Sequence, residues 1–213
     1  MAKTVAQPEP EAERNSSEES EEPMPSLLIC SLGNPGAAYA TTLHSAGHVL
    51  VNALRLQLSQ PTFAKDRMLG NGLVSAPSYG SEPDWTLWQS TAYMNESGKG
   101  VRAAYVQWVK THNAPRGRLV VVHDELEKPL GSLTVKGNSQ NLSARGHNGL
   151  KSCIASLRGV EDDWIRVGVG IGRPQSRESN DVAKYVLKKM SPVEKEKVES
   201  AAVELLERLR DLD

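Results

Sequence analysis

The residues of this sequence that could do chemistry are one histidine, one aspartate and three asparagines beside turns or apolar runs. They are His44, Asp124, Asn34, Asn95 and Asn148. An imidazole can take a proton from water near neutral pH, and a carboxylate can fix its tautomer and stabilise its charged form. Amides can hold a carbonyl group and its developing oxyanion without titrating. Because no serine or cysteine lies in a known nucleophile motif, the set suits direct hydrolysis of an already reactive ester.

Two patterns suggest metal or redox chemistry, and neither fits well. His44 and His48 stand four residues apart like two zinc ligands on a helix, but Ser45 occupies the place of the glutamate in H-E-x-x-H. We therefore expect no metal at this pair and no chemical role for His48. Cys30 and Cys153 match no metal or redox spacing, so we interpret them as buried free thiols in a reducing compartment.

Several of the other candidates have a structural alternative. Asn95 could be a helix N-cap, and Asp124 a satisfied carboxylate at the end of a strand. The segment ARGHNGLK (144–151) is an anion-binding or amide-binding loop, or only a turn. GVGIG (168–172) resembles a dinucleotide fingerprint, but it lies in an apolar run and Pro174 follows it, where the fingerprint would open a helix. The combination of candidates favours a site more than any single residue does.

The first 25 residues differ in composition from the remainder. Residues 1–25 hold seven glutamates and only two basic residues, a net charge of −5, whereas residues 26–213 carry +4. We expect a disordered acidic tail followed by one folded domain, 26–213, because the tail has too little apolar surface to offset its ordering entropy. The tail lacks the apolar core of a signal peptide and is too acidic for a typical transit peptide. It therefore favours a cytoplasmic protein and does not support a mitochondrial location, which stays possible.

Apolar periodicity predicts alternating strands and helices. We expect strands at 26–32, 85–90, 118–126, 132–136 and 164–171, and helices at 45–58, 95–110, 146–157 and 191–212. The last helix opens with the capping signal Ser-Pro-Val-Glu. This alternation predicts a single-domain α/β fold, a three-layer α/β/α sandwich around a twisted, mostly parallel mixed sheet. Site residues of such folds gather at strand ends and in the loops beyond them.

Four ordered blocks of the sequence resemble one known family. GNPGAAYATTLHSAGH, YMNESGKGV, VVHDELEKPLGSLTVK and GHNGLKS are similar to the signature blocks of the bacterial-type peptidyl-tRNA hydrolases. The resemblance extends from about residue 27 to the C-terminal helix. It implies a hydrolase that needs no metal or organic cofactor and cleaves the ester between a peptide and the 3′-terminal ribose of tRNA, which recycles the tRNA.

The resemblance also implies roles for individual residues. His44 matches the catalytic base, and Asp124 matches the carboxylate that stabilises its basic form. Asn34 matches the asparagine that distinguishes peptidyl-tRNA from free aminoacyl-tRNA. The positions that line the site for the tRNA 3′ CCA end and its peptide are matched by Tyr39, Tyr93, Asn95 and Asn148. We expect Asn95 to take part in catalysis as well.

This chain departs from the family pattern in several places. Ser45 stands where asparagine is usual, Tyr93 replaces phenylalanine, and KGNSQNLSARGHNG (136–149) replaces a more glycine-rich loop. The family also has a two-residue basic clamp for the tRNA 5′-phosphate. Lys136 matches one partner, and either Trp164 or Arg166 takes the other position, depending on the alignment.

Two other functions compete with hydrolysis. One is a non-catalytic RNA-binding relative of the same fold, like the organelle splicing factors similar to these hydrolases, and intact His44, Asp124 and Asn95 argue against it. The other is a nucleotide-dependent enzyme, which would need a glycine-rich phosphate loop that the sequence lacks. We expect a monomer that binds peptidyl-tRNA and no membrane.

Overall fold

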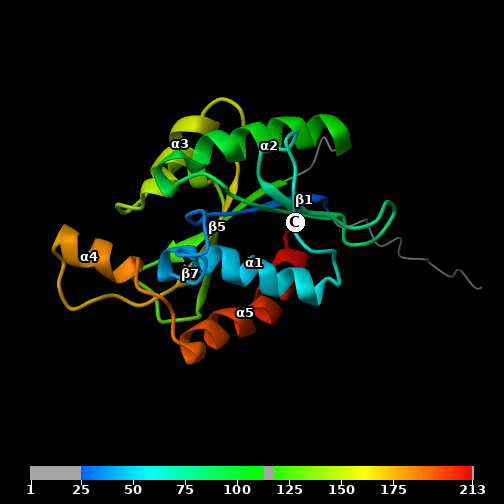
Figure 1. Cartoon of the computed structure of the whole chain (residues 1–213). Helices are drawn as coiled ribbons and strands as arrows, with labels where there is room; N and C mark the ends of the chain where they lie inside the picture. The colour runs from blue at the N-terminus through cyan, green and yellow to red at the C-terminus, as the bar shows by residue number, and fades with distance from the viewer. Residues whose placement is uncertain (1–24, 113–117, 213) are drawn as a thin grey trace, which may run out of the picture.

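The computed structural model describes residues 25–112 and 118–212. Within them a seven-stranded sheet lies between two layers of helices (Figure 1). The expected acidic tail falls outside the described residues except for Pro25, so its disorder and the domain boundary stay predictions. No helix in the described part of the chain is long and apolar enough to cross a membrane.

The sheet is mixed with a parallel centre, as the sequence predicts. Its order is β2-β3-β4-β1-β5-β7-β6, in which β4, β1, β5 and β7 run parallel and the pairs β2–β3, β3–β4 and β6–β7 are antiparallel. The strands are β1 (Leu27–Ser31), β2 (Ala64–Lys65), β3 (Leu73–Ser75), β4 (Trp85–Gln89), β5 (Arg118–Glu125), β6 (Leu133–Lys136) and β7 (Ile165–Gly170).

Helices cover both faces of the sheet and explain why its central strand is apolar without alternation. The helices α1 (Ala46–Gln57) and α5 (Pro192–Arg210) pack together on one face, and α2 (Ser97–His112) and α3 (Asn148–Leu157) on the other (Figure 1). Val120 and Val122 of β5 join the core under α1 and α5, whereas Leu119 and Val121 join the opposite core. A strand buried on both faces reads as a continuous apolar run.

The predicted elements are confirmed within a few residues, with three omissions. The two short strands β2 and β3 and the helix α4 (Ser179–Val186) were not expected. The capping box at α5 is present, since the Ser191 hydroxyl accepts from the Glu194 N–H and the Glu194 carboxylate accepts from the Ser191 N–H. Asn95 is not an N-cap: it lies inside a 3-10 turn, Met94–Glu96, that precedes α2.

Candidate active site

A cavity of about 800 Å³ opens at the carboxyl end of the central strands. β1 pairs with β5 only as far as Ser31 and Val122, so His123–Glu125 continue beyond the point where the β1 chain turns away. The turn after β1, the end of β5 and the start of α3 therefore meet at one edge of the sheet. This is the edge where parallel α/β folds place their ligands.

A close approach between α1 and β5 brings His44 to this edge. His44 lies in a 3-10 turn, Leu43–Ser45, directly before α1. A Cβ atom at Gly47 would lie only 2.8 Å from the carbonyl oxygen of Val122, so only glycine lets the first turn of α1 pack this tightly on the strand. His44 is thereby placed against Asp124, two residues beyond Val122.

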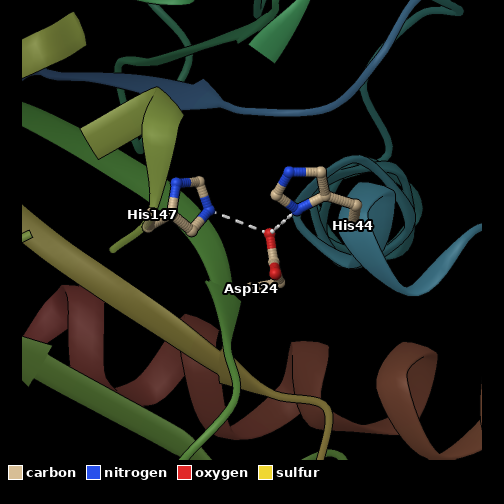
Figure 2. Close-up of side chains that lie close together, drawn as sticks. All are labelled: His44, Asp124 and His147. Atoms are coloured by element: carbon tan, nitrogen blue, oxygen red, sulfur yellow. Dashed lines mark hydrogen bonds and ion pairs between the residues drawn. The ribbon is translucent and has the colours of Figure 1, made fainter. Parts of the chain in front are cut away.

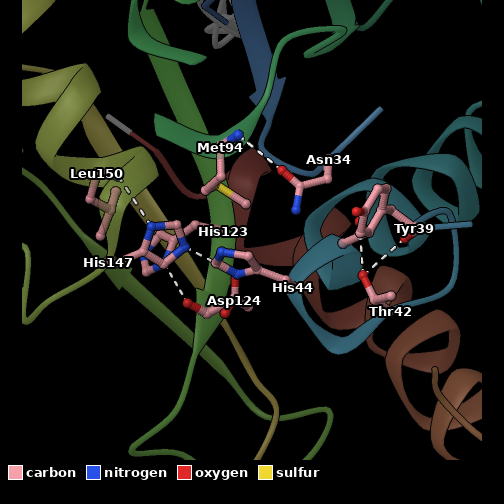
Figure 3. Close-up of polar contacts among 10 residues, drawn as sticks. Asn34, Tyr39, Thr42, His44, Met94, His123, Asp124, His147 and Leu150 are labelled. Carbon is pink, nitrogen blue, oxygen red and sulfur yellow. Dashed lines mark hydrogen bonds and ion pairs between the residues drawn. The ribbon is translucent and has the colours of Figure 1, made fainter. Parts of the chain in front are cut away.

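Most residues expected from the sequence line this one cavity. They are Asn34, His44, Tyr93, Asn95, Asp124, Lys136 and Asn148. Tyr39 does not line it. Its carbonyl oxygen instead accepts hydrogen bonds from the hydroxyl and the N–H of Thr42, which closes the turn before His44 (Figure 3).

Two histidines share one oxygen of Asp124 (Figure 2). His44 Nδ1 lies 2.8 Å from Asp124 Oδ1, and His147 Nε2 lies 2.9 Å from the same atom. His147 is also the N-cap of α3, since its Nδ1 accepts from the Leu150 N–H at 3.2 Å. Because Nδ1 of His147 is an acceptor, its proton sits on Nε2 and points at Asp124.

These contacts leave one free lone pair on the pair of imidazoles. Both nitrogens of His147 are engaged in hydrogen bonds, so this ring presents no free nitrogen to the cavity. The neutral His44 ring donates its Nδ1–H to Asp124, which leaves Nε2 unprotonated on the part of the ring away from the carboxylate. His44 lines the cavity with 15 % of its side chain exposed, and its Nε2 is the available base.

The electrostatics favour a basic His44 and an ionised Asp124. Burial alone would lower the pKa of His44, but the charge of Asp124 and its hydrogen bond outweigh burial and raise it above 6.5. Burial alone would raise the pKa of Asp124, but the charges and N–H groups of His147 and His44 hold it well below its ordinary value. The carboxylate therefore stays charged at neutral pH and can stabilise an imidazolium at His44.

His44, Asp124 and His147 also form a set of possible metal ligands, with donor atoms within 4.8 Å of one another. Zinc would lie about 2.0–2.1 Å from each nitrogen, whereas here both nitrogens point their protons at an oxygen 2.8 and 2.9 Å away. An ion would have to displace both protons and push Asp124 aside. The contacts are those of a hydrogen-bonded trio.

Two asparagine side chains present donors to the cavity. Asn34 Oδ1 accepts from the Met94 N–H at 3.0 Å (Figure 3). Asn148 Oδ1 lies 3.4 Å from Lys151 Nζ. Both partners can only donate, so each amide must turn its oxygen toward them. The NH₂ groups of Asn34 and Asn148 remain available to a carbonyl oxygen of a bound ligand.

Comparisons with known proteins identify the family to which the chain belongs. The family model described as peptidyl-tRNA hydrolase matches residues 28–212. The chain belongs to this family. A peptidyl-tRNA hydrolase of Desulfitobacterium hafniense is 41% identical over 163 residues, which cover 75% of this chain and 78% of the relative. A probable peptidyl-tRNA hydrolase of Schizosaccharomyces pombe is 36% identical over 175 residues, which cover 81% of this chain and 76% of the relative.

Solved structures of the peptidyl-tRNA hydrolase family share the fold. The crystal structure of peptidyl-tRNA hydrolase from Acinetobacter baumannii has a TM-score of 0.67 and 29% identity, and the match covers 86% of each chain. The resemblance seen in the four sequence blocks is thus confirmed over nearly the whole described domain.

Both residues considered as the partner of Lys136 in the peptidyl-tRNA hydrolase clamp are buried. Trp164 is fully buried, and its indole N–H lies 3.2 Å from Gln140 Oε1. Arg166 is 6% exposed, and its Nη groups donate to the carbonyl oxygens of Ser139 and Ser143 at 2.9 Å. Arg166 therefore secures the segment that leads to His147.

The departure from the family at Ser45 is internal. Ser45 is fully buried, and its hydroxyl lies 3.3 Å from that of Thr42, so it packs inside the turn and does not line the cavity. His48 is also turned inward, since its Nδ1 lies 2.8 Å from the Ser31 hydroxyl. Burial lowers the pKa of His48 to about 4, which keeps this ring neutral.

Sequence reasoning missed two histidines of the site. His147 was noticed only as part of a possible loop motif, and His123 was not singled out. His123 donates Nδ1–H to the Asp124 carbonyl oxygen at 2.7 Å, and its ring packs edge-on to His147. Burial, with the adjacent His147, lowers the pKa of His123 to about 3. The sequence held a signal for both residues, since His123 directly precedes Asp124 and His147 directly precedes the helix α3.

We expect His147→Asn and His147→Ala to separate the two roles of His147. Asparagine is a good N-cap, so His147→Asn should keep α3 stable but lose the contact with Asp124. kcat should fall several-fold, and the acid limb of the rate profile should shift. His147→Ala should lose stability as well, by about 1 kcal/mol for the cap. Equal thermal midpoints in both variants, with unchanged kcat, would contradict these roles.

Proposed function

We propose that this chain hydrolyses the ester bond between the peptide and the 3′-terminal ribose of peptidyl-tRNA, with His44 as general base on water. The observation that carries the proposal is the free Nε2 of His44 at the cavity, with Asp124 behind the ring at 2.8 Å. Membership of the peptidyl-tRNA hydrolase family supports the reaction and the substrate.

The chemistry uses water directly. His44 Nε2 takes a proton from a water molecule as its oxygen attacks the ester carbonyl, and Asp124 stabilises the imidazolium that forms. Asn95 and Asn148 line the same cavity, and in this proposal their amide N–H groups hold the carbonyl oxygen as negative charge develops on it. The proton then passes to the departing ribose oxygen, which gives a free peptide carboxylate and tRNA with its hydroxyl restored.

Substrate selection is assigned to the groups around this centre. The free NH₂ of Asn34 donates to the peptide group next to the ester. A free aminoacyl-tRNA has no peptide group at this place, so it lacks this contact. Tyr93, 60% exposed, offers a ring on which a base of the CCA end can stack. Tyr39 as a tRNA contact, Lys136 as a 5′-phosphate contact, the monomeric state and the cytoplasmic location are further parts of the proposal.

The test compares a peptidyl-tRNA with the aminoacyl-tRNA of the same amino acid. The wild-type protein should cleave the first and leave the second nearly intact. Asn34→Asp keeps the acceptor for Met94 but loses the NH₂ donor, so kcat/KM for peptidyl-tRNA should fall by about 10-fold or more. Asn141→Asp adds the same charge at a residue that does not line the cavity, and its kcat/KM should stay near the wild-type value. If the wild type is selective but Asn34→Asp keeps the wild-type kcat/KM for peptidyl-tRNA, Asn34 does not have this role.

A further inference from the structure

The backbone turn that carries Asn34 rests on the ring of His48. A Cβ atom added to Gly33, the residue before Asn34, would lie 2.4 Å from His48 Cδ2 and 2.5 Å from His48 Nε2. Gly33 does not have a positive φ, so the ring of His48, and not backbone strain, excludes a side chain there. The imidazole therefore fills the place that a side chain of residue 33 would take.

The ring of His48 is itself held at the end of β1. Its Nδ1 lies 2.8 Å from Ser31 Oγ, and Ser31 is the fully buried last residue of that strand. The Ser31 hydroxyl also lies 3.3 Å from the carbonyl oxygen of Trp88 on the neighbouring strand β4. The backbone of His48 is held by the same strand, since its carbonyl oxygen accepts from Gln89 Nε2 at 3.3 Å. His48 is thus tied to the β1–β4 pair through both its ring and its main chain.

His48 reaches the Asn34 turn from a different cavity than the one that contains His44. It lines a second cavity of about 370 Å³ together with Asn34, Pro35 and Gly36, and it does not line the first. Asn34 lines both cavities, so its turn forms part of the wall between them. His48 therefore lies behind this wall, where it can act on a substrate bound beside His44 only through the turn.

We infer that His48 is a positioning residue, which holds Asn34 where its NH₂ group can bind the peptide of the substrate. The side chain of Asn34 is fixed at its far end, because Oδ1 accepts from the Met94 N–H at 3.0 Å (Figure 3). The ring of His48 fixes the backbone at the near end. Such support matters because a displacement of about 1 Å can lower a rate by about 10²-fold. The inference rests on the proposed role of Asn34 and adds His48 to it.

Two replacements of His48 separate the role of its ring from that of its hydrogen bond. His48→Asn keeps an amide that can meet the Ser31 hydroxyl, but it lacks the ring atoms that lie against Gly33. His48→Phe keeps a ring at Gly33 and loses the contact between Nδ1 and Ser31. If the ring supports the turn, His48→Asn should behave like His48→Ala, and His48→Phe should keep a KM for peptidyl-tRNA close to that of the wild type. The reverse order of the two variants would overturn the inference.

The main experiment measures kcat and KM for peptidyl-tRNA in a double-mutant cycle of His48 and Asn34. His48→Ala should raise KM by about 3- to 10-fold with kcat nearly unchanged, because Asn34 contacts the bound substrate and the transition state alike. In the Asn34→Asp background, His48→Ala should change KM by about 2-fold or less, because the donor that His48 positions is already absent. A variant that is merely less stable would instead lose kcat in proportion to its unfolded fraction, with KM unchanged.

A steric test uses Gly33, with Asn52 as the control. Gly33→Ala should raise KM as His48→Ala does, because its methyl group would push the turn away from the His48 ring. The double variant of Gly33→Ala and His48→Ala should have a KM closer to the wild-type value than Gly33→Ala alone, because the methyl group then enters the space that the ring has left. Asn52→Ala, one turn further along α1 and in the same second cavity, should keep the wild-type KM.

The outcomes distinguish a failure of the inference from a failure of the proposed function. A wild-type protein that does not cleave peptidyl-tRNA would refute the function, and the inference with it. If the wild type cleaves its substrate, two results overturn the inference alone. One is a rise in KM from His48→Ala that is equally large with Asn34 and with Asn34→Asp, and the other is a KM of His48→Ala equal to that of Asn52→Ala.

Discussion

Replacement of His44 by alanine is expected to lower kcat for peptidyl-tRNA hydrolysis by about 10²–10⁴-fold, the usual contribution of a positioned general base. The reason is that Nε2 of His44 carries the one imidazole lone pair that is free to accept a proton from water. Both nitrogens of His147 are already engaged in hydrogen bonds. The measurement is the initial rate of peptide release at saturating substrate.

The control for this variant is His112→Ala, which removes an exposed imidazole at the end of α2. It should keep the wild-type rate. A far-ultraviolet circular dichroism melt should give His44→Ala a midpoint within a few degrees of wild type, because the side chain lies at the cavity and not in either core. A kcat of His44→Ala within a few-fold of wild type would exclude His44 as the base.

Asp124→Asn is the second large effect, with an expected loss of about 10- to 10³-fold in kcat/KM, because an opposite charge this close shifts a pKa by about 1–3 units. The amide can still accept the His44 Nδ1–H but cannot stabilise the imidazolium. In the wild type Asp124 raises the pKa of His44 above 6.5. Since only neutral His44 is a base, kcat/KM rises with pH through that pKa.

The direction of the pH shift is the diagnostic result for Asp124. Without the carboxylate, burial still lowers the pKa of His44, so the acid limb should move to lower pH while its plateau drops. Loss of rate with an acid limb in its wild-type place would mean that Asp124 acts on orientation alone. No change in either would make it a structural residue.

The central strands and helices could be predicted from the sequence because each leaves a pattern within its own residues. The apolar run of β5 reflects burial on both faces, and the capping signal of α5 is a pattern within four residues. β2 consists of two exposed residues, and β3 is only three residues long with Ser75 as its one buried residue, so both strands bury little apolar surface and left no such signal. The short helix α4 has one buried residue, Val186.

The site was predictable in its residues but not in its geometry. His44, Asp124 and Asn34 could be named because chemistry and family blocks single them out. That His147 shares an oxygen with His44 depends on where the fold places the start of α3 relative to the end of β5, which spacing along the chain does not give. The same holds for Arg166, whose role is decided by the carbonyl oxygens around it, and for His48, whose ring only the fold brings against Gly33.

Single-turnover cleavage tests the central claim most directly, because it separates an enzyme from an RNA-binding relative of the same fold. Labelled peptidyl-tRNA is mixed with a large excess of protein, so all of it is bound, and the esterified fraction is followed with time. We predict that the ester disappears in one exponential phase, giving free peptide and intact tRNA, and that His44→Ala slows this phase without loss of binding. A complex in which the ester survives as long as it does in buffer would contradict the account.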